Sequence, residues 1–87
     1  MLFRFMELTR QISDFSEIPV SKNGNRFLSF RAKQLRDDGT MCPEMTLTVW
    51  GDEHCKLIHS LEFGELVQIE GTVKEFGTIT SIEKGVM

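Results

Sequence analysis

The stretch MTLTVWGDEHCKLIHSLEFGELVQIEGTV, residues 45–73, decides the fold of this chain. Its first six residues alternate between apolar and other side chains, which predicts a strand that ends at Trp50. A helix is predicted directly after Gly51, with Asp52 as its N-cap. The helix is indicated by residues at the spacing i, i+3, i+4 and i+7, which form one apolar stripe: His54, Leu57, Ile58 and Leu61. The alternation then returns, with an inward face formed by Val67, Ile69, Gly71 and Val73. The stretch therefore predicts a strand, a helix and a strand in succession.

The chain before this stretch is predicted to be extended. Apolar residues alternate along residues 2–20, but the register of the alternation changes within the segment. We therefore expect one long first strand with bends or bulges near residues 13–14 and 16–17. Lys22-Asn23-Gly24-Asn25 predicts a tight turn. Residues 26–36 alternate well, with one set of side chains on a core face: Leu28, Phe30 and Ala32.

Two further segments complete the predicted fold. Residues 37–40 are typical of a turn, and residues 78–83 predict a last strand. The chain then has five strands, with one short helix between the third and the fourth. This order predicts a single domain, residues 1–87, of the all-β class: a five-stranded OB-fold barrel.

Composition limits the class of protein. The chain has 87 residues, 40% of them hydrophobic, and no apolar run approaches the ~18 residues that span a bilayer. Charges interrupt the apolar start, so we expect neither a signal peptide nor a membrane partner. Cys42 and Cys55 lack zinc-ribbon or C-x-x-C spacing, which favours a reduced, cytoplasmic protein. The net charge of −3 argues mildly against a nucleic-acid partner, but cations cluster in residues 26–36.

Two short motifs resemble the single-stranded DNA-binding protein family, including its short phage-encoded and primosomal members. They are T-V-W-G at residues 48–51, followed at once by the helix, and V-Q-I-E-G-T-V at residues 67–73. The resemblance implies an OB-fold in which the aromatic at the strand end stacks on a base. The chain lacks the family's long Gly- and Pro-rich tail with an acidic tip, and its loop around Phe76-Gly77 is short. The missing tail argues against a role in recruiting repair enzymes, and the short loop implies a smaller footprint on the strand.

The predicted binding residues lie on the face of the sheet that points away from the core. Trp50 and Phe27 are the expected stacking residues, and Arg31 and Lys33 are expected to neutralise phosphates. Further candidates along the same track are Lys22, Arg26, Arg36, Lys74 and Thr48. Two alternatives stay open. Trp50 could instead pack on the helix or on a dimer partner, and the cations could form exposed pairs with Glu44, Glu70 or Glu75.

Other chemistry is disfavoured by the sequence. Cys42, His54, Cys55 and His59 could in principle form a zinc set, but His54 projects about 100° from Cys55 on a helix. No phosphate-binding loop, dinucleotide-binding motif or nucleophile elbow occurs in the chain. We therefore expect no metal, no cofactor and no enzyme activity.

These observations predict a protein that binds single-stranded DNA with little sequence preference, as an accessory to replication or recombination. RNA remains an alternative ligand because stacking does not distinguish the sugar. Because one barrel covers few nucleotides, we expect a homodimer or higher homo-oligomer, with replication or recombination proteins as further partners. A compact chain of this kind would suit a phage or mobile element. The alternative function is an OB-fold protein-interaction module in which Trp50 and Phe27 form the centre of a protein interface.

Overall fold

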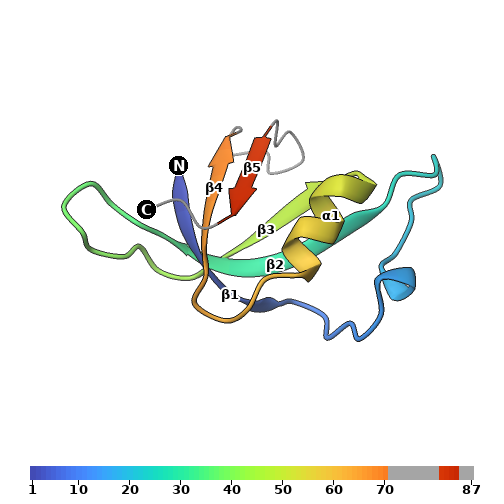
Figure 1. Cartoon of the computed structure of the whole chain (residues 1–87), viewed down its shortest axis with the longest axis horizontal. Helices are drawn as coiled ribbons and strands as arrows, with labels where there is room; N and C mark the ends of the chain where they lie inside the picture. The colour runs from blue at the N-terminus through green and yellow to red at the C-terminus, as the bar shows by residue number, and fades with distance from the viewer. Residues whose placement is uncertain (71–80, 85–87) are drawn as a thin grey trace.

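A computed structural model describes residues 1–70 and 81–84 of the chain (Figure 1). The fold is mostly β, with one short α-helix between the third and fourth strands. The strands pair antiparallel in the order β3-β2-β1-β4-β5, and the sheet curls into a half-barrel (Figure 1). The elements are β1 (Leu2–Leu8), the 3-10 turn η1 (Phe15–Glu17), β2 (Phe27–Gln34), β3 (Met45–Trp50), α1 (Asp52–His59), β4 (Leu66–Glu70) and β5 (Ser81–Lys84).

A bulge in β1 corrects the predicted first strand. Phe5 lies opposite Ala32 of β2, whereas Glu7 lies opposite the preceding β2 residue, so Met6 is an extra residue. The extra residue shifts the alternation, and both Phe5 and Leu8 can therefore contact the core. The prediction of one long strand over residues 2–20 was wrong: β1 ends at Leu8, and the bulge lies well before the expected bends.

The segment between β1 and β2 is held to the core by apolar anchors rather than by strand pairing. Ile12 and Ile18 are buried within it. Asp14 caps η1 by accepting a hydrogen bond from the amide of Ser16 at 3.2 Å. Before β2, Gly24 adopts a positive φ of 82°, as the predicted turn requires.

The hairpin of β2 and β3 follows the predicted alternation. Leu28, Phe30 and Ala32 are buried, as are Leu47 and Val49 of β3. The turn between the two strands projects beyond the sheet (Figure 1). Within this turn, hydrogen bonds from Thr40 to the side chain of Asp38 hold the pKa of that carboxyl below its ordinary value.

Helix α1 begins one residue earlier than predicted. Gly51, with φ of 98°, occupies the N-cap position and Asp52 is the first helical residue, so the prediction of Asp52 as N-cap was wrong. The buried helical side chains are Cys55 and Ile58. His54 does not belong to the buried stripe: its Nδ1 lies 3.0 Å from the carbonyl oxygen of Trp50. The buried face of α1 therefore contains Cys55 and not, as predicted, His54.

Strand β4 buries Val67 and Ile69, as predicted. Strand β5 overlaps the predicted last strand, while Gly71, Val73 and residues 78–80 lie outside the described residues. In the part of the chain that the structure describes, none of the helices combines the length and hydropathy that a membrane span needs.

Candidate nucleic-acid interface

An aromatic pair lies on the outer face of β2 and β3. The register places Phe27 directly opposite Trp50, and their ring centroids are 5.0 Å apart with an interplanar angle of 34°. The two rings point outward because the neighbouring residues in their strands, Leu28 and Val49, point into the core. Trp50 is 39% exposed. The two predicted stacking residues therefore form one aromatic surface that solvent can reach.

A polar pair follows the aromatic pair along the strands. Ser29 lies opposite Thr48, and their hydroxyl oxygens are 2.9 Å apart. Either hydroxyl can be the donor. The pair therefore offers both a donor and an acceptor beside the aromatic rings, and Thr48 is one of the predicted contact residues.

Arg31 comes next on the same face and is engaged in ion pairs. Its guanidinium pairs with Glu7 of β1, and its Nη1 lies 3.1 Å from Oε1 of Glu44. All three side chains are partly exposed. Such pairs between exposed groups contribute only about 0.2–1 kcal/mol each. Arg31 is therefore restrained by carboxylates and is not a free cation, which is the alternative that the sequence analysis left open for this residue.

Lys33 and Arg4 lie opposite each other on the outer face. The Nη1 of Arg4 donates to the carbonyl oxygen of Gly64 at 2.8 Å. Within residues 1–70 and 81–84, Lys33 makes no ion pair. Like charges directly across a pair of strands repel, and a bound anion would relieve that repulsion. Arg4 was not among the predicted site residues, although the alternation of Phe3 and Phe5, which are both buried, places Arg4 on the outer face.

Arg26 has a structural position. Its guanidinium donates to the carbonyl oxygen of Ile18 at 3.0 Å, pairs with Asp52 at 3.1 Å and lies 4.7 Å from the centre of the Phe15 ring. These contacts tie the segment before β2 to the start of α1. Arg26 was predicted as a further candidate for nucleic-acid binding, but its guanidinium is already engaged in these intramolecular contacts.

The remaining predicted cations lie at the two ends of the face. Lys22 is exposed in the turn before β2, at the same end as Trp50. Arg36 is exposed just after β2, where its Nη1 donates to the hydroxyl of Thr40 at 3.2 Å. Lys74 lies outside the described residues. From Phe27 to Lys33 the face runs about 20 Å, at ~3.3 Å per strand residue. An aromatic end and a cationic end are thus joined by one polar stretch.

A second feature borders the aromatic end. A cleft of about 370 Å³ lies between the turn before β2 and the first turn of α1, lined in part by Asn25, Trp50 and His54. The carboxylates of Asp52 and Glu53 also line it. This cleft is a recess beside Trp50 in which a flat ligand could lie.

The cysteines and histidines do not gather into a metal site. Cys55 is buried in the core, and burial raises the pKa of its thiol to about 11. His59 lies against the main chain, with Nε2 3.2 Å from the carbonyl oxygen of Ile12. Over residues 1–70 and 81–84, no group of three or more potential ligands is placed to hold a metal ion.

Comparison with models of protein families, with curated proteins and with solved structures gives no match to this chain.

Proposed function

We propose that the chain is an OB-fold barrel. The observed order β3-β2-β1-β4-β5 is the order of such a barrel opened between β3 and β5, and α1 lies between β3 and β4 as the fold requires. In OB-folds the face of strands 2 and 3 carries oligonucleotides. That face holds the aromatic pair in this chain.

On this fold we propose binding of single-stranded DNA with little sequence preference. The observation that carries the proposal is the exposed pair of Phe27 and Trp50, followed along the same face by hydroxyls and cations. Bases stack on aromatic rings with about 1–3 kcal/mol each, whatever their identity. Lys33 and Arg4 would then neutralise phosphates of the same strand. An accessory role in replication or recombination would follow from such binding.

Titration with oligo-dT tests this proposal directly. The chain has one tryptophan and no tyrosine, so its intrinsic fluorescence reports on Trp50. We expect quenching that weakens as salt rises, because displaced counterions oppose phosphate binding. Absence of both quenching and an electrophoretic mobility shift at low salt would overturn the proposal.

Matched variants locate the binding face. Lys33→Glu reverses a cation on the face, whereas Lys56→Glu makes the same charge change on the exposed side of α1. We expect the first variant to weaken oligo-dT binding more than the second. Phe27→Ala is expected to weaken binding about five-fold or more through lost stacking. Equal effects of the two lysine variants would mean that only net charge matters and that the face is not the site.

Self-association is part of the proposal. One barrel covers about 4–16 nucleotides, so a homodimer or larger homo-oligomer would raise the affinity for a longer strand. Analytical ultracentrifugation with and without oligo-dT would detect it. A monomer under both conditions would remove this part of the proposal while leaving strand binding intact.

A second function, a protein-interaction module, is favoured by the pairing of Arg31. Glu7 and Glu44 offset its charge, and Arg26 is engaged with Asp52, so few free cations remain on the face. In that case Trp50 and Phe27 would anchor a protein partner. The two functions differ in their salt response, because an apolar interface changes little with ionic strength.

A further inference from the structure

Strand β1 has an edge that is only partly paired. It pairs with β2 as far as Leu8, but its pairing with β4 reaches only Arg4. Phe5 completes that side through main-chain hydrogen bonds with Glu65 and Gly64, at 2.7 and 2.8 Å. Beyond Phe5, no strand among the described residues pairs with this edge of β1.

The main chain of Leu8 points toward the unpaired edge. The amide of Thr9 donates to the carbonyl oxygen of Ser29 at 3.1 Å and is therefore directed at β2. Because main-chain groups of successive strand residues point in opposite directions, the amide and carbonyl of Leu8 face away from β2. An unpaired strand edge of this kind is a template for pairing with another extended chain.

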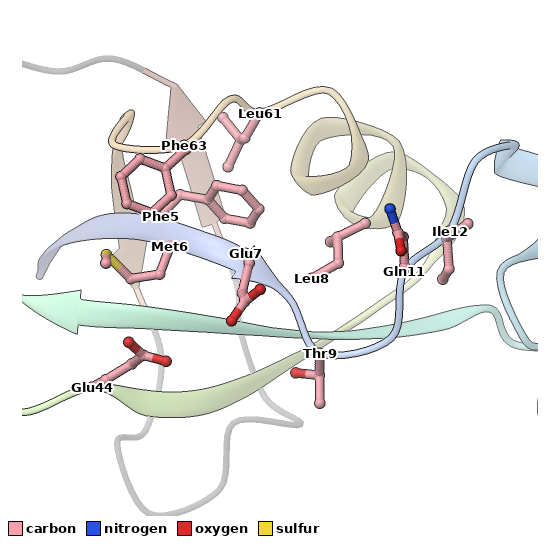
Figure 2. A pocket seen from close by; sticks show the side chains of 10 residues that line it. All are labelled: Phe5, Met6, Glu7, Leu8, Thr9, Gln11, Ile12, Glu44, Leu61 and Phe63. Atoms are coloured by element: carbon pink, nitrogen blue, oxygen red, sulfur yellow. The ribbon is translucent and has the colours of Figure 1, made fainter.

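A cleft of about 710 Å³ lies along this edge, and one of its sides is apolar (Figure 2). In Figure 2 the rings of Phe5 and Phe63 lie on the same side of the β1 ribbon, with Leu61 above them. Phe63 is 75% exposed and is the most exposed of the large hydrophobic residues in the described chain. Phe63 lines the cleft together with Phe5 and Leu61, so the exposed ring is part of a contiguous apolar surface and not a single exposed residue.

The other side of the cleft is acidic. Figure 2 shows the carboxylates of Glu7 and Glu44 pointing toward one another on the opposite side of β1. No lysine or arginine is among the described residues that line the cleft. Glu62 and Glu65 also flank Phe63 in the chain. Arg31 pairs with Glu7 and Glu44 and so offsets one of their two charges, which leaves an excess of negative charge on this side of the cleft. That excess favours a cation over a phosphate as the occupant of the cleft.

We propose that this cleft binds an extended segment of a partner protein in which basic and apolar residues alternate. Successive side chains of an added strand point to opposite faces of the sheet. One set would contact the apolar side, at Phe63, and the other would reach the carboxylates of Glu7 and Glu44. Main-chain hydrogen bonds with Leu8 would fix the segment to the edge of β1. Charge complementarity selects a basic occupant over an acidic one.

Defined peptides test the proposal. The probe is a capped, fluorescently labelled peptide of about seven residues that alternates Lys with Val, and its matched counterpart carries Glu in place of Lys. We expect the Lys peptide to bind at least about ten-fold more tightly than the Glu peptide. In ¹⁵N-resolved NMR spectra of the full chain, the perturbed amides should be those of residues 6–9 and 61–64. N-methylation of the central peptide residue should weaken binding, because it removes a main-chain donor.

Two variants distinguish binding at the cleft from non-specific binding to exposed apolar residues. Phe63→Ala removes the exposed ring and is expected to weaken binding of the Lys peptide about ten-fold. Val20→Ala is the matched control, because Val20 is also exposed, at 50%, but lies before β2 away from the cleft. Circular dichroism would check that both variants remain folded.

Several outcomes would overturn the proposal. These are no binding of the Lys peptide, equal binding of both peptides, or NMR perturbations confined to the face of Trp50. Loss of self-association in Phe63→Ala would show instead that a second copy of the chain occupies the cleft. Because none of these readouts uses nucleic acid, they leave the proposed strand binding untouched.

Discussion

Releasing Arg31 from its carboxylates should strengthen the proposed binding of single-stranded DNA. In the structure its guanidinium pairs with both Glu7 and Glu44, and its side chain is 43% exposed. Each exposed pair contributes about 0.2–1 kcal/mol, so the two together restrain Arg31 by about 1 kcal/mol. The double variant Glu7→Gln/Glu44→Gln removes both partners while keeping side-chain size. If the freed guanidinium contacts a phosphate, affinity for oligo-dT should rise about five-fold at low salt.

The salt dependence gives a sharper measure than the affinity. Each added phosphate contact on a single strand steepens the slope of log affinity against log salt by about 0.7. Fluorescence titrations at several salt concentrations would measure this slope in the double variant and in wild type.

The control must change net charge equally. Glu17→Gln/Glu62→Gln also removes two exposed carboxylates, neither of which forms an ion pair among the described residues. We expect this control to raise affinity only slightly. An unchanged slope in Glu7→Gln/Glu44→Gln, or an equal slope change in the control, would refute the argument that Arg31 is a masked phosphate contact.

Three further predictions concern stability and reactivity. Phe30→Ala should lower the free energy of unfolding by about 3–5 kcal/mol, because the ring is fully buried, whereas Phe63→Ala should change it by less than about 0.5 kcal/mol; urea denaturation measures both. Arg26→Ala should destabilise the protein by about 2 kcal/mol and speed proteolysis between β1 and β2, because the guanidinium bonds to that segment; unchanged cleavage would contradict this role. The pKa of the Cys55 thiol is raised by burial from 9.0 to about 11, so its contribution to stability is present below about pH 9 and is lost as pH rises toward about 11. Cys55→Ala should flatten that decline, and Cys42 should be alkylated faster than Cys55 in the native protein.

The β2–β3 hairpin could be predicted from sequence because its information is local. Residues alternate without interruption in both strands, and Gly39 adopts a positive φ in the turn between them. Strand β1 could not be predicted in the same way. Its bulge at Met6 carries no glycine, and it exists because both Phe5 and Leu8 contact a core that other strands complete.

In the candidate site, too, the features that depend on local sequence could be predicted and those that depend on several segments could not. The facing of Phe27 and Trp50 follows from the register of one hairpin, and alternation alone predicts that both point outward. The partners of Arg31 come from β1 and from the residue before β3, and their positions depend on how three segments meet. The spacing of residues in the sequence does not show how these three segments pack together. The cations could therefore be assigned to a face of the sheet, but their ion-pair partners could not be predicted.

Arg31 links the proposed strand-binding face to the proposed peptide cleft, because its two carboxylate partners line that cleft. Lysines of a docked peptide would compete for Glu7 and Glu44 and leave Arg31 free for a phosphate. Reciprocity then requires that peptide and oligo-dT strengthen each other's binding by the same factor, which we expect to be a few-fold given the exposure of the pairs. The measurement is an oligo-dT titration with and without the Lys peptide, repeated in Phe63→Ala to subtract direct binding of peptide to oligonucleotide. In Glu7→Gln/Glu44→Gln the strengthening should vanish, because Arg31 is already free. Competition between peptide and oligo-dT in the wild-type protein would mean that both occupy one surface, and would contradict the separation of face and cleft.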